Sequence, residues 1–226
     1  MRWIRLKAAI LLWSAWNHMT ERYFTELTNA FVRGKLGQAD VTIEDGVNAG
    51  LRLHKFKVNS ELPRVQRILG ILHGLTPENL LDIGSGRGTF LWPLLATFPE
   101  LRVTAIDFSE RRSRDLAAVR HGGIERLNVV RMDAERPAFA RGAFDVVTML
   151  EVLEHLKNPQ QALNGLVAIA RRFVLLSVPS VPDENPEHLH LFSQEQIREM
   201  ARIAGAARTT VEHVLNHRIV LIRVAA

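Results

Sequence analysis

Cysteine is absent from the chain, because none of its 226 residues carries a thiol. This absence excludes a disulfide framework, a thiolate-bound zinc site and a cysteine nucleophile. A protein without disulfides suits a reducing compartment, so we expect a cytoplasmic location. Internal repeats and low-complexity segments are also absent.

Long apolar runs are missing as well. No run approaches the ~20 residues of a membrane-spanning helix, so we expect no integral membrane insertion. The nearest run is Ala8–Trp16, which follows three basic residues and superficially resembles a signal peptide. No small-residue cleavage pattern follows it, and we therefore expect one long amphipathic helix instead. Its apolar positions continue at helical spacing through Leu12, Trp16, Met19, Tyr23 and Leu27.

The surplus of positive charge lies in the first third of the chain. The formal net charge is +5, and residues 1–75 hold 11 Lys and Arg against 6 Asp and Glu, whereas residues 76–226 hold 18 of each. Aromatic residues are interleaved with these cations, at Trp3, Trp13, Trp16, Tyr23, Phe24, Phe31 and Phe56. Three interpretations stay open: a helical cover packed on the core, a basic helix on an anionic membrane or around a lipid-like substrate, and contact with nucleic acid or another polyanion.

Length and composition bound the architecture. Hydrophobic residues make up 47% of the chain and charged residues 23%, which is typical of a globular protein with its own core. A length of 226 residues suits one domain with an appendage. We therefore expect an N-terminal helical cap over residues 1–75 and a core domain over residues 76–226.

From Leu80 onward, short apolar runs alternate with helical patterns, which is typical of βαβ units around a parallel sheet. The predicted strands are Leu80–Ile83, Arg102–Ile106, Asn128–Arg131, Phe144–Met149 and Phe173–Val178, and the predicted helices are Thr89–Phe98, Glu110–Arg120, Pro159–Ala170 and Gln194–Ala204. Arg208–Val214 and Arg218–Val224 flank a turn at Leu215–His217 and predict an antiparallel hairpin. The expected fold is α/β, a doubly wound and mostly parallel sheet that this hairpin closes.

A glycine-rich turn, Asp82-Ile83-Gly84-Ser85-Gly86-Arg87-Gly88, follows the first predicted strand. Such glycines let a ligand approach the backbone, although turns also use glycine for steric reasons alone. Gly88 comes one position before the third glycine of the G-x-G-x-x-G dinucleotide motif, and the Asp82 carboxylate would repel a diphosphate. The turn therefore disfavours an NAD-dependent oxidoreductase and indicates a ligand with an ammonium or sulfonium charge.

Two further acids end the next two predicted strands. Asp107 lies about 20 residues beyond the turn, where an acid accepts the hydroxyls of a ribose. Capping of the helix that begins near Ser109 is the alternative. Asp133 can accept from an exocyclic amine such as that of adenine, or it can cap a local turn. Because the carboxyl ends of parallel strands share one edge of a sheet, we expect all three acids to line one crevice.

These acids, the glycine-rich turn and the segment Phe144-Asp145-Val146-Val147 together resemble the class I S-adenosylmethionine-dependent methyltransferases over residues 76–226. The resemblance implies that S-adenosylmethionine is the cofactor. The cofactor-binding residues it implies are Gly84, Ser85, Gly86 and Gly88 around the methionine part, Asp107 at the ribose, Asp133 at the adenine, and Phe108 and Ala134 against the base, with Asp82 and Leu150 in the same set.

The segment after the fourth predicted strand holds Glu151, Glu154 and His155, which share one face if it is helical. It resembles the E-x-x-E-H segment of ubiquinone-pathway O-methyltransferases and, more weakly, that of small-RNA 2′-O-methyltransferases, in which two glutamates and two histidines hold magnesium. By this resemblance a bound metal would lie among Glu151, Glu154, His155 and His188, with His190 as the alternative to His188. A segment that only orients the backbone, without metal, stays open.

These features predict a methyltransferase that acts on oxygen or nitrogen of a small or lipid-like acceptor by direct in-line displacement. The enzyme aligns the reactants and excludes water, and needs no covalent intermediate. His155 is the candidate base, and Glu154 or His188 would orient it. The alternatives are a metal-assisted RNA 2′-O-methyltransferase and a non-catalytic cofactor-binding subunit. Peripheral membrane contact is compatible with a lipid-like acceptor.

Overall fold

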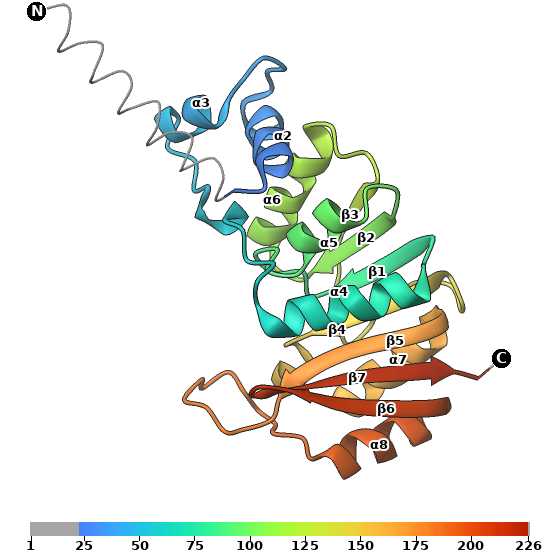
Figure 1. Cartoon of the computed structure of the whole chain (residues 1–226). Helices are drawn as coiled ribbons and strands as arrows, with labels where there is room; N and C mark the ends of the chain where they lie inside the picture. The colour runs from blue at the N-terminus through green and yellow to red at the C-terminus, as the bar shows by residue number, and fades with distance from the viewer. Residues whose placement is uncertain (1–22, 226) are drawn as a thin grey trace, which may run out of the picture.

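The computed structural model describes residues 23–225, which fold around a seven-stranded sheet of order β3-β2-β1-β4-β5-β7-β6 (Figure 1). Strands β1 to β5 pair in parallel, whereas β7 runs antiparallel to both β5 and β6. The predicted α/β, doubly wound sheet with a terminal hairpin is therefore confirmed. The strands are β1 (Asn79–Ile83), β2 (Arg102–Asp107), β3 (Leu127–Arg131), β4 (Phe144–Leu150), β5 (Ala170–Pro179), β6 (Ala206–Val214) and β7 (His217–Val224).

The strand order reverses between β1 and β4. From β1 the chain proceeds to β2 and β3 on one side, and it then returns to place β4 and β5 on the other side. The connections that leave the carboxyl ends of β1 and β4 therefore diverge, and open α/β sheets bind their ligands at such a point. Asp82 of β1 stands opposite Thr148 of β4 in the strand register.

Helices cover both faces of the sheet (Figure 1). On one face, α4 (Pro63–Leu75), α5 (Leu91–Thr97) and α6 (Glu110–His121) share a hydrophobic cluster with the strands. On the other face, α7 (Pro159–Ile169) and α8 (Gln194–Ile203) share a second cluster. Strands β1 and β4 are almost wholly buried, as expected where both faces are covered. Before α4 come α2 (Thr25–Leu36), α3 (Ile43–Asn48) and the 3-10 helix η1 (His54–Phe56), which extend the first cluster.

Helix α2 lies directly against α6, and two glycines make this contact close. A Cβ atom at Gly34 of α2 would lie 1.9 Å from the carbonyl oxygen of Ala118, and a Cβ atom at Gly122 would lie 1.7 Å from that of Ala30. Arg33 donates a hydrogen bond of 2.7 Å from Nε to the carbonyl oxygen of Gly122. Any larger side chain at either glycine would force the two helices apart.

The prediction of one long N-terminal helix is wrong at Tyr23 and Phe24, which are not helical in the structure. Residues 1–22, with the predicted helical positions up to Met19, lie outside the described residues. Tyr23 forms a bridge with Lys57, and the Phe24 N–H donates to the Phe56 carbonyl oxygen at 2.9 Å. This pairing with the segment around η1 holds Tyr23 and Phe24 in a non-helical conformation, so α2 begins only after them.

The remaining boundaries differ from the predictions by a few residues. Strand β5 begins at Ala170 rather than Phe173, because it continues along β4 as far as Phe144. The hairpin turn consists of Leu215 and Asn216 alone, and His217 already belongs to β7. Leu215 adopts a positive φ of 51°, a conformation that leucine rarely takes, so this turn lacks the Asn-Gly pair typical of two-residue hairpins.

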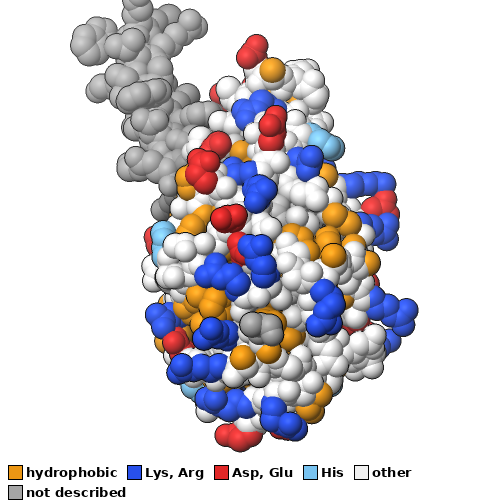
Figure 2. Space-filling model, turned by 90° about the vertical axis from the view of Figure 1, so that its right-hand side faces the viewer, with side chains coloured by type: hydrophobic (Ala, Val, Ile, Leu, Met, Phe, Trp, Pro, Cys, Tyr) orange, Lys and Arg blue, Asp and Glu red, His pale blue; other side chains and the backbone are white. Residues whose placement is uncertain are grey.

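Two features of the helices and the surface bear on contact with a bilayer, helix length and apolar character. Within residues 23–225, no helix combines the length and apolar character needed to cross a bilayer. On the face drawn in Figure 2, Lys and Arg side chains are numerous and stand among Asp, Glu and scattered hydrophobic side chains. Scattered apolar side chains of this kind are ordinary on a folded protein's surface.

Candidate active site

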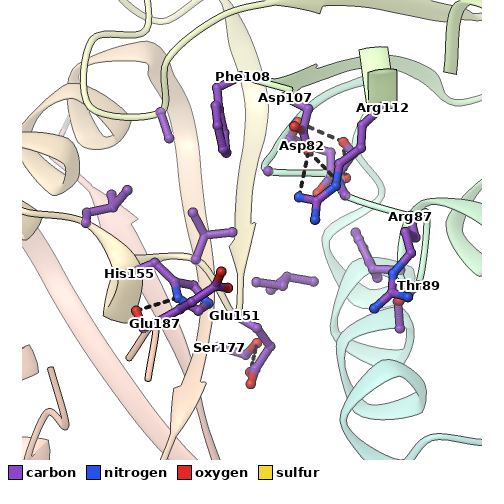
Figure 3. A pocket seen from close by; sticks show the side chains of 18 of the residues that line it. Asp82, Arg87, Thr89, Asp107, Phe108, Arg112, Glu151, His155, Ser177 and Glu187 are labelled. Carbon is purple, nitrogen blue, oxygen red and sulfur yellow. Dashed lines mark hydrogen bonds and ion pairs between the residues drawn. The ribbon is translucent and has the colours of Figure 1, made fainter. Parts of the chain in front are cut away.

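A cavity of about 600 Å³ opens at the carboxyl ends of the central strands (Figure 3). Its walls come from the turn after β1 and from the segments that follow β2, β3 and β4. Helix α4 adds Arg64, Val65 and Ile68, three lining residues that the sequence analysis did not identify. A cavity of this size accommodates a ligand as large as a nucleoside derivative.

The glycine-rich turn after β1 needs glycine for its conformation as well as for space. Gly84, Gly86 and Gly88 all have positive φ, of 73°, 59° and 85°. A Cβ atom at Gly84 would lie 2.4 Å from Cγ2 of Val152, and one at Gly88 would lie 2.0 Å from the Trp92 ring. Steric demands therefore account for two of these glycines, while a Cβ atom at Gly86 would meet only the Gly84 carbonyl oxygen, at an ordinary 3.6 Å, and Gly86 lines the cavity.

Asp82 is held by two hydroxyl groups at the end of β1. Ser85 Oγ donates to its Oδ2 at 2.6 Å, and Thr148 Oγ1 donates to its Oδ1 at 2.7 Å. Burial raises the pKa of Asp82 to about 6, against the two hydrogen bonds, and the neighbouring charge of Asp107 raises it further. A cationic group in the cavity would lower this pKa and favour the ionised carboxylate.

Replacement of Asp82 by asparagine is expected to stabilise the protein increasingly as the pH rises from about 4 to 7. Because the folded-state pKa is about 6 and lies above the ordinary aspartate value of 3.8, the folded protein holds this proton more tightly than the unfolded chain does. Stability is therefore lost as the pH rises through that interval. The shift corresponds to about 3 kcal/mol at most. Urea unfolding at several pH values measures the difference. The Thr148→Val variant, which removes one hydrogen bond to the carboxylate, should steepen the wild-type trend; equal pH profiles for wild type and Asp82→Asn would contradict the prediction.

Asp107 lies at the end of β2 with its carboxylate fixed by the backbone. Gly86 N–H donates to Oδ2 at 2.9 Å, and Ser109 N–H donates to Oδ1 at 2.8 Å. Arg112 Nη1 lies 3.8 Å from Oδ2. The residue that caps α6 is Ser109 itself, whose side chain accepts from Arg112 N–H, so Asp107 is not the helix cap. Each Asp107 oxygen retains a lone pair for a hydroxyl group of a ligand.

The third acid and the predicted base-contacting residues line the same cavity. Phe108 leaves 69% of its surface exposed, an unusual exposure for a large aromatic side chain, and its ring stands at the cavity wall in Figure 3. Asp133, Ala134 and Leu150 also line the cavity. Asp133 Oδ1 accepts from Glu135 N–H at 2.9 Å, so this acid also stabilises its own loop. The structure thus places all the predicted cofactor-facing acids around one space.

Glu151 departs from the predicted arrangement, because the segment after β4 is not a continuous helix. Glu151 has a positive φ of 55°, and only the short 3-10 helix η2 (Leu153–His155) follows. Ser177 Oγ donates to Glu151 Oε1 at 2.6 Å, and His217 Nδ1 lies 3.1 Å from Oε2. The prediction that Glu151, Glu154 and His155 share one helical face is therefore wrong: β5 and β7 hold Glu151 apart.

Glu154 is fully buried, and both of its carboxyl oxygens lack a hydrogen-bond partner among the described residues. Burial raises the pKa of Glu154 to about 8, and the charges of Glu151 and Asp183 add to this effect. Its backbone carbonyl accepts from the N–H groups of Leu189 and His190 at 2.9 and 3.2 Å. The Glu154 backbone thus holds the loop that precedes α8 beside the cavity. Its buried side chain is either protonated or available as a ligand for a cation.

His155 and His188 lie side by side near Glu154. Their ring centroids are 4.7 Å apart, and one ligand atom from each of the three residues falls within 4.8 Å of the others. His155 Nδ1 lies 2.9 Å from the Glu187 carbonyl oxygen, which can only accept, so neutral His155 carries its proton on Nδ1 and a lone pair on Nε2. His190 is directed elsewhere: its Nε2 bonds to the Leu156 carbonyl oxygen at 2.9 Å.

Sequence reasoning missed several polar residues of the site. Thr148 and Ser177 lie inside the apolar runs of β4 and β5, which gave no sign of a functional role, and their hydroxyl groups bond to Asp82 and Glu151. Arg87 and Arg112 line the cavity from the glycine-rich turn and from α6. Only the strand register, which pairs Asp82 with Thr148, shows why a hydroxyl group is needed at that position.

The sheet order, the glycine-rich turn after β1 and the acids at the ends of three adjacent strands define the class I S-adenosylmethionine-dependent methyltransferase fold. Residues 81–172 match the methyltransferase domain family, in agreement with this fold. The match runs from within β1 to the start of β5, and it includes Asp82, Asp107 and Asp133 as well as Glu151, Glu154 and His155.

Relatives with curated functions point the same way. Ribosomal RNA small subunit methyltransferase G of Lactococcus lactis is 36% identical over 112 residues, which are 44% of this chain and 47% of that protein. Malonyl-[acyl-carrier protein] O-methyltransferase of Geobacter sulfurreducens is 26% identical over 170 residues, 66% of this chain and 62% of that protein. The chain therefore spans less than two thirds of either relative. Among solved structures, an S-adenosylmethionine-dependent methyltransferase from Aquifex aeolicus is similar in fold, with a TM-score of 0.60, 20% identity and coverage of 74% of this chain and 93% of that one.

Proposed function

We propose that the protein transfers a methyl group from S-adenosylmethionine to an oxygen or nitrogen atom of a small or lipid-like acceptor. The observation that carries this proposal is a single cavity with Asp82, Asp107 and Asp133 along one part and His155 at another. Figure 3 displays this separation, with Asp107 and Phe108 at one end and His155 and Glu187 at the other. The methyltransferase domain over residues 81–172 supports the same activity.

Each acid is suited to one part of the cofactor. The Asp107 carboxylate, oriented by Gly86 and Ser109, would accept from the ribose hydroxyls. Asp133 would accept from the adenine amine, and the exposed ring of Phe108 would stack on the base. The Asp82 carboxylate would attract the cationic methionine part near the glycine-rich turn. A cofactor with a positive charge and no phosphate fits this acid-lined cavity.

The proposed reaction is an in-line displacement at the methyl carbon. A lone pair of the acceptor atom forms the new bond to carbon, the carbon–sulfur bond breaks, and its electron pair returns to sulfur, which becomes a neutral thioether. An acceptor hydroxyl would lose its proton to Nε2 of His155, which is available because Nδ1 is engaged by Glu187. A positive centre disappears in this step, so a cavity that excludes water favours it.

The walls near His155 support an acceptor with an apolar part. Val152, Leu156 and Leu189 line the cavity there, and Leu189 is 54% exposed on its rim. Apolar side chains at an open rim can cover a ring or an alkyl chain and bring its hydroxyl group to the imidazole. The two curated relatives act, by their names, on malonyl-[acyl-carrier protein] and on ribosomal RNA, so their names do not agree on an acceptor. The apolar rim is the feature that favours the small or lipid-like class here.

Isothermal titration with S-adenosylmethionine, S-adenosylhomocysteine and NAD tests the cofactor. Binding of the first two without NAD is the expected result. Incubation with radiolabelled cofactor and pooled phenolic, amine and fatty-acid acceptors then tests transfer. Cofactor binding without product from any pool would support the non-catalytic subunit instead, and failure of both cofactors to bind would refute the proposal.

A metal-assisted RNA 2′-O-methyltransferase is the second candidate, and the group of Glu154, His155 and His188 favours it. The buried, unpartnered carboxyl group of Glu154 and two neighbouring imidazoles are a donor set that suits a divalent cation. Nδ1 of His188 lies 2.9 Å from Asp183, an outer contact typical of metal-ligating histidines. Glu151 does not fit, because Ser177 and His217 engage it. A bound cation would supply Lewis-acid polarisation of an acceptor hydroxyl.

For this second candidate, the wild-type protein is expected to bind one Mn²⁺ ion, and Glu154→Gln is expected to weaken binding at least about tenfold, because removal of an anionic ligand costs a charge-assisted contact. Electron paramagnetic resonance of free Mn²⁺ measures the affinity without any acceptor. Glu151→Gln is the matched control and should bind as the wild type does. No binding, or equal binding by Glu154→Gln, would argue against the metal.

A further inference from the structure

A second cavity, of about 140 Å³, adjoins the first behind the glycine-rich turn. It lies between η1, the turn after β1 and the start of α6, three segments that are far apart in the sequence. We name it the basic recess, because five cationic side chains line it: Arg52, Lys55, Arg87, Arg111 and Arg112. No residue of this recess except Arg112 and the shared glycine-rich turn has a part in the proposed methyl transfer.

The positive charge of the basic recess is not balanced locally. Asp115 is the one acid that lines it, and this acid is already paired with Lys35 at 2.7 Å and with Lys55 at 2.5 Å. Although burial raises it, hydrogen bonds from these two lysines hold the pKa of Asp115 below its usual value. Burial lowers the pKa of Lys55 against the hydrogen bond and charge of Asp115, and the charges of Lys35 and Arg111 add to the lowering. Among the described residues, Asp115 is thus shared by two lysines and leaves no carboxylate for the arginines of the recess.

Three of the guanidinium groups have no partner of their own. Within residues 23–225, the side chains of Arg52, Arg87 and Arg111 form no ion pair and no hydrogen bond. Elsewhere in the described chain, exposed arginines pair readily, as Arg67 does with Glu212 and Arg202 with Glu199. Three unpaired guanidinium groups around one small hollow are thus a ready set of donors for an external anion.

The dimensions and chemistry of the basic recess favour a phosphoryl group over a carboxylate. Guanidinium groups donate in planar pairs that match phosphate oxygens, and several such groups from different directions suit a tetrahedral dianion. A volume of about 140 Å³ holds one such group but not an extended chain. Arg52 and Lys55 also belong to the first third of the chain, so part of the positive charge surplus of residues 1–75 lies in this recess.

From these observations we infer that the basic recess binds the phosphoryl group of a small phosphate ester. Gly86, Arg87 and Arg112 line both cavities, so the organic part of such an ester can extend towards the larger cavity. Figure 3 places Arg112 beside Asp107 and Arg87 near Thr89 at the wall of the larger cavity. The inference does not depend on the proposed methyl transfer, because the anion can be titrated without cofactor or acceptor.

The test is calorimetric titration of the full chain with glycerol 3-phosphate and with inorganic phosphate, at low and constant ionic strength. Both probes are expected to bind at one site, with the ester at least as tight as the free anion. The double variant Arg52→Gln/Arg111→Gln should weaken both at least about tenfold, since it removes charge-assisted donors. Both residues are unpartnered, so the variant should melt at the wild-type temperature.

Arg114→Gln is the matched control. Arg114 is an exposed arginine of the same helix, it pairs with Glu110, and it lines neither cavity. The control should bind both probes as the wild type does. Equal losses in the control and in the double variant would show a general charge effect and overturn the inference. Binding of inorganic phosphate without the ester, or binding of an RNA oligonucleotide when neither small probe binds, would overturn it as well.

Discussion

Replacing His155 with alanine is expected to lower the turnover number by about 10²- to 10⁴-fold, the usual contribution of a general base. The reason lies in the geometry: the Glu187 carbonyl oxygen fixes the Nδ1 proton, and Nε2 is then the acceptor for a hydroxyl proton beside the cavity. The affinity for S-adenosylmethionine should change little, because His155 stands away from the acids that would hold the cofactor. Turnover by product formation and affinity by calorimetry measure the two effects separately.

His190→Gln serves as the matched control for this prediction. His190 lies in the loop before α8, which contacts η2 through the Glu154 carbonyl oxygen. Its ring bonds to the Leu156 carbonyl oxygen, and glutamine retains an N–H donor for that bond. Its turnover should stay within about threefold of the wild type, a difference smaller than 1 kcal/mol in activation free energy. An unchanged turnover number in His155→Ala, or an equal loss in both variants, would remove His155 from the mechanism.

The second large effect is expected at Asp107. Its replacement by alanine should raise the dissociation constant for S-adenosylmethionine by about 100-fold, because two hydrogen bonds to a charged group are lost. The variant also frees the Gly86 and Ser109 N–H groups, which now fix the turn and the start of α6. Calorimetry with cofactor and with S-adenosylhomocysteine should give the same loss, because the ribose is common to both ligands.

Two variants separate ligand contact from local structure at this position. Asp107→Asn keeps the size and an acceptor oxygen, so it should fold normally and still lose much of the affinity. Glu110→Gln alters a nearby exposed acid that pairs with Arg114 and Arg131, and it should bind the cofactor as the wild type does. An Asp107→Ala protein that melts normally and binds within about threefold of the wild type would contradict the ribose role.

The sheet was predictable from the sequence because its central strands are buried on both faces. Continuous apolar runs such as those of β1 and β4 are typical of buried strands, and their alternation with helices indicates parallel pairing. The same logic placed Asp82, Asp107 and Asp133 at one edge, since parallel strands end together. The sequence therefore predicted at which end of the strands the cavity opens and which acids border it.

The rest depends on contacts between distant segments. Spacing alone suggested one face for Glu151 and Glu154, but β5 and β7 supply Ser177 and His217, which hold Glu151 in a left-handed conformation. The end of the predicted N-terminal helix failed for a similar reason, because Phe24 pairs with Phe56 far along the chain. The basic recess is lined by η1, the glycine-rich turn and α6, and no local sequence pattern predicts that these three segments lie together.

The glycine contacts between α2 and α6 support one side of the cavity. With backbone against backbone at Gly34 and Gly122, α2 packs firmly on α6, which places Arg112 beside Asp107 at the cavity wall. On the opposite side, Glu187 and Leu189 line the cavity at the end of the exposed segment 181–187, and the Glu154 carbonyl oxygen accepts from Leu189 N–H. A ligand is therefore expected to enter the cavity on the side of Glu187 and Leu189, because the packed helices α2 and α6 support the side of Asp107 and Arg112.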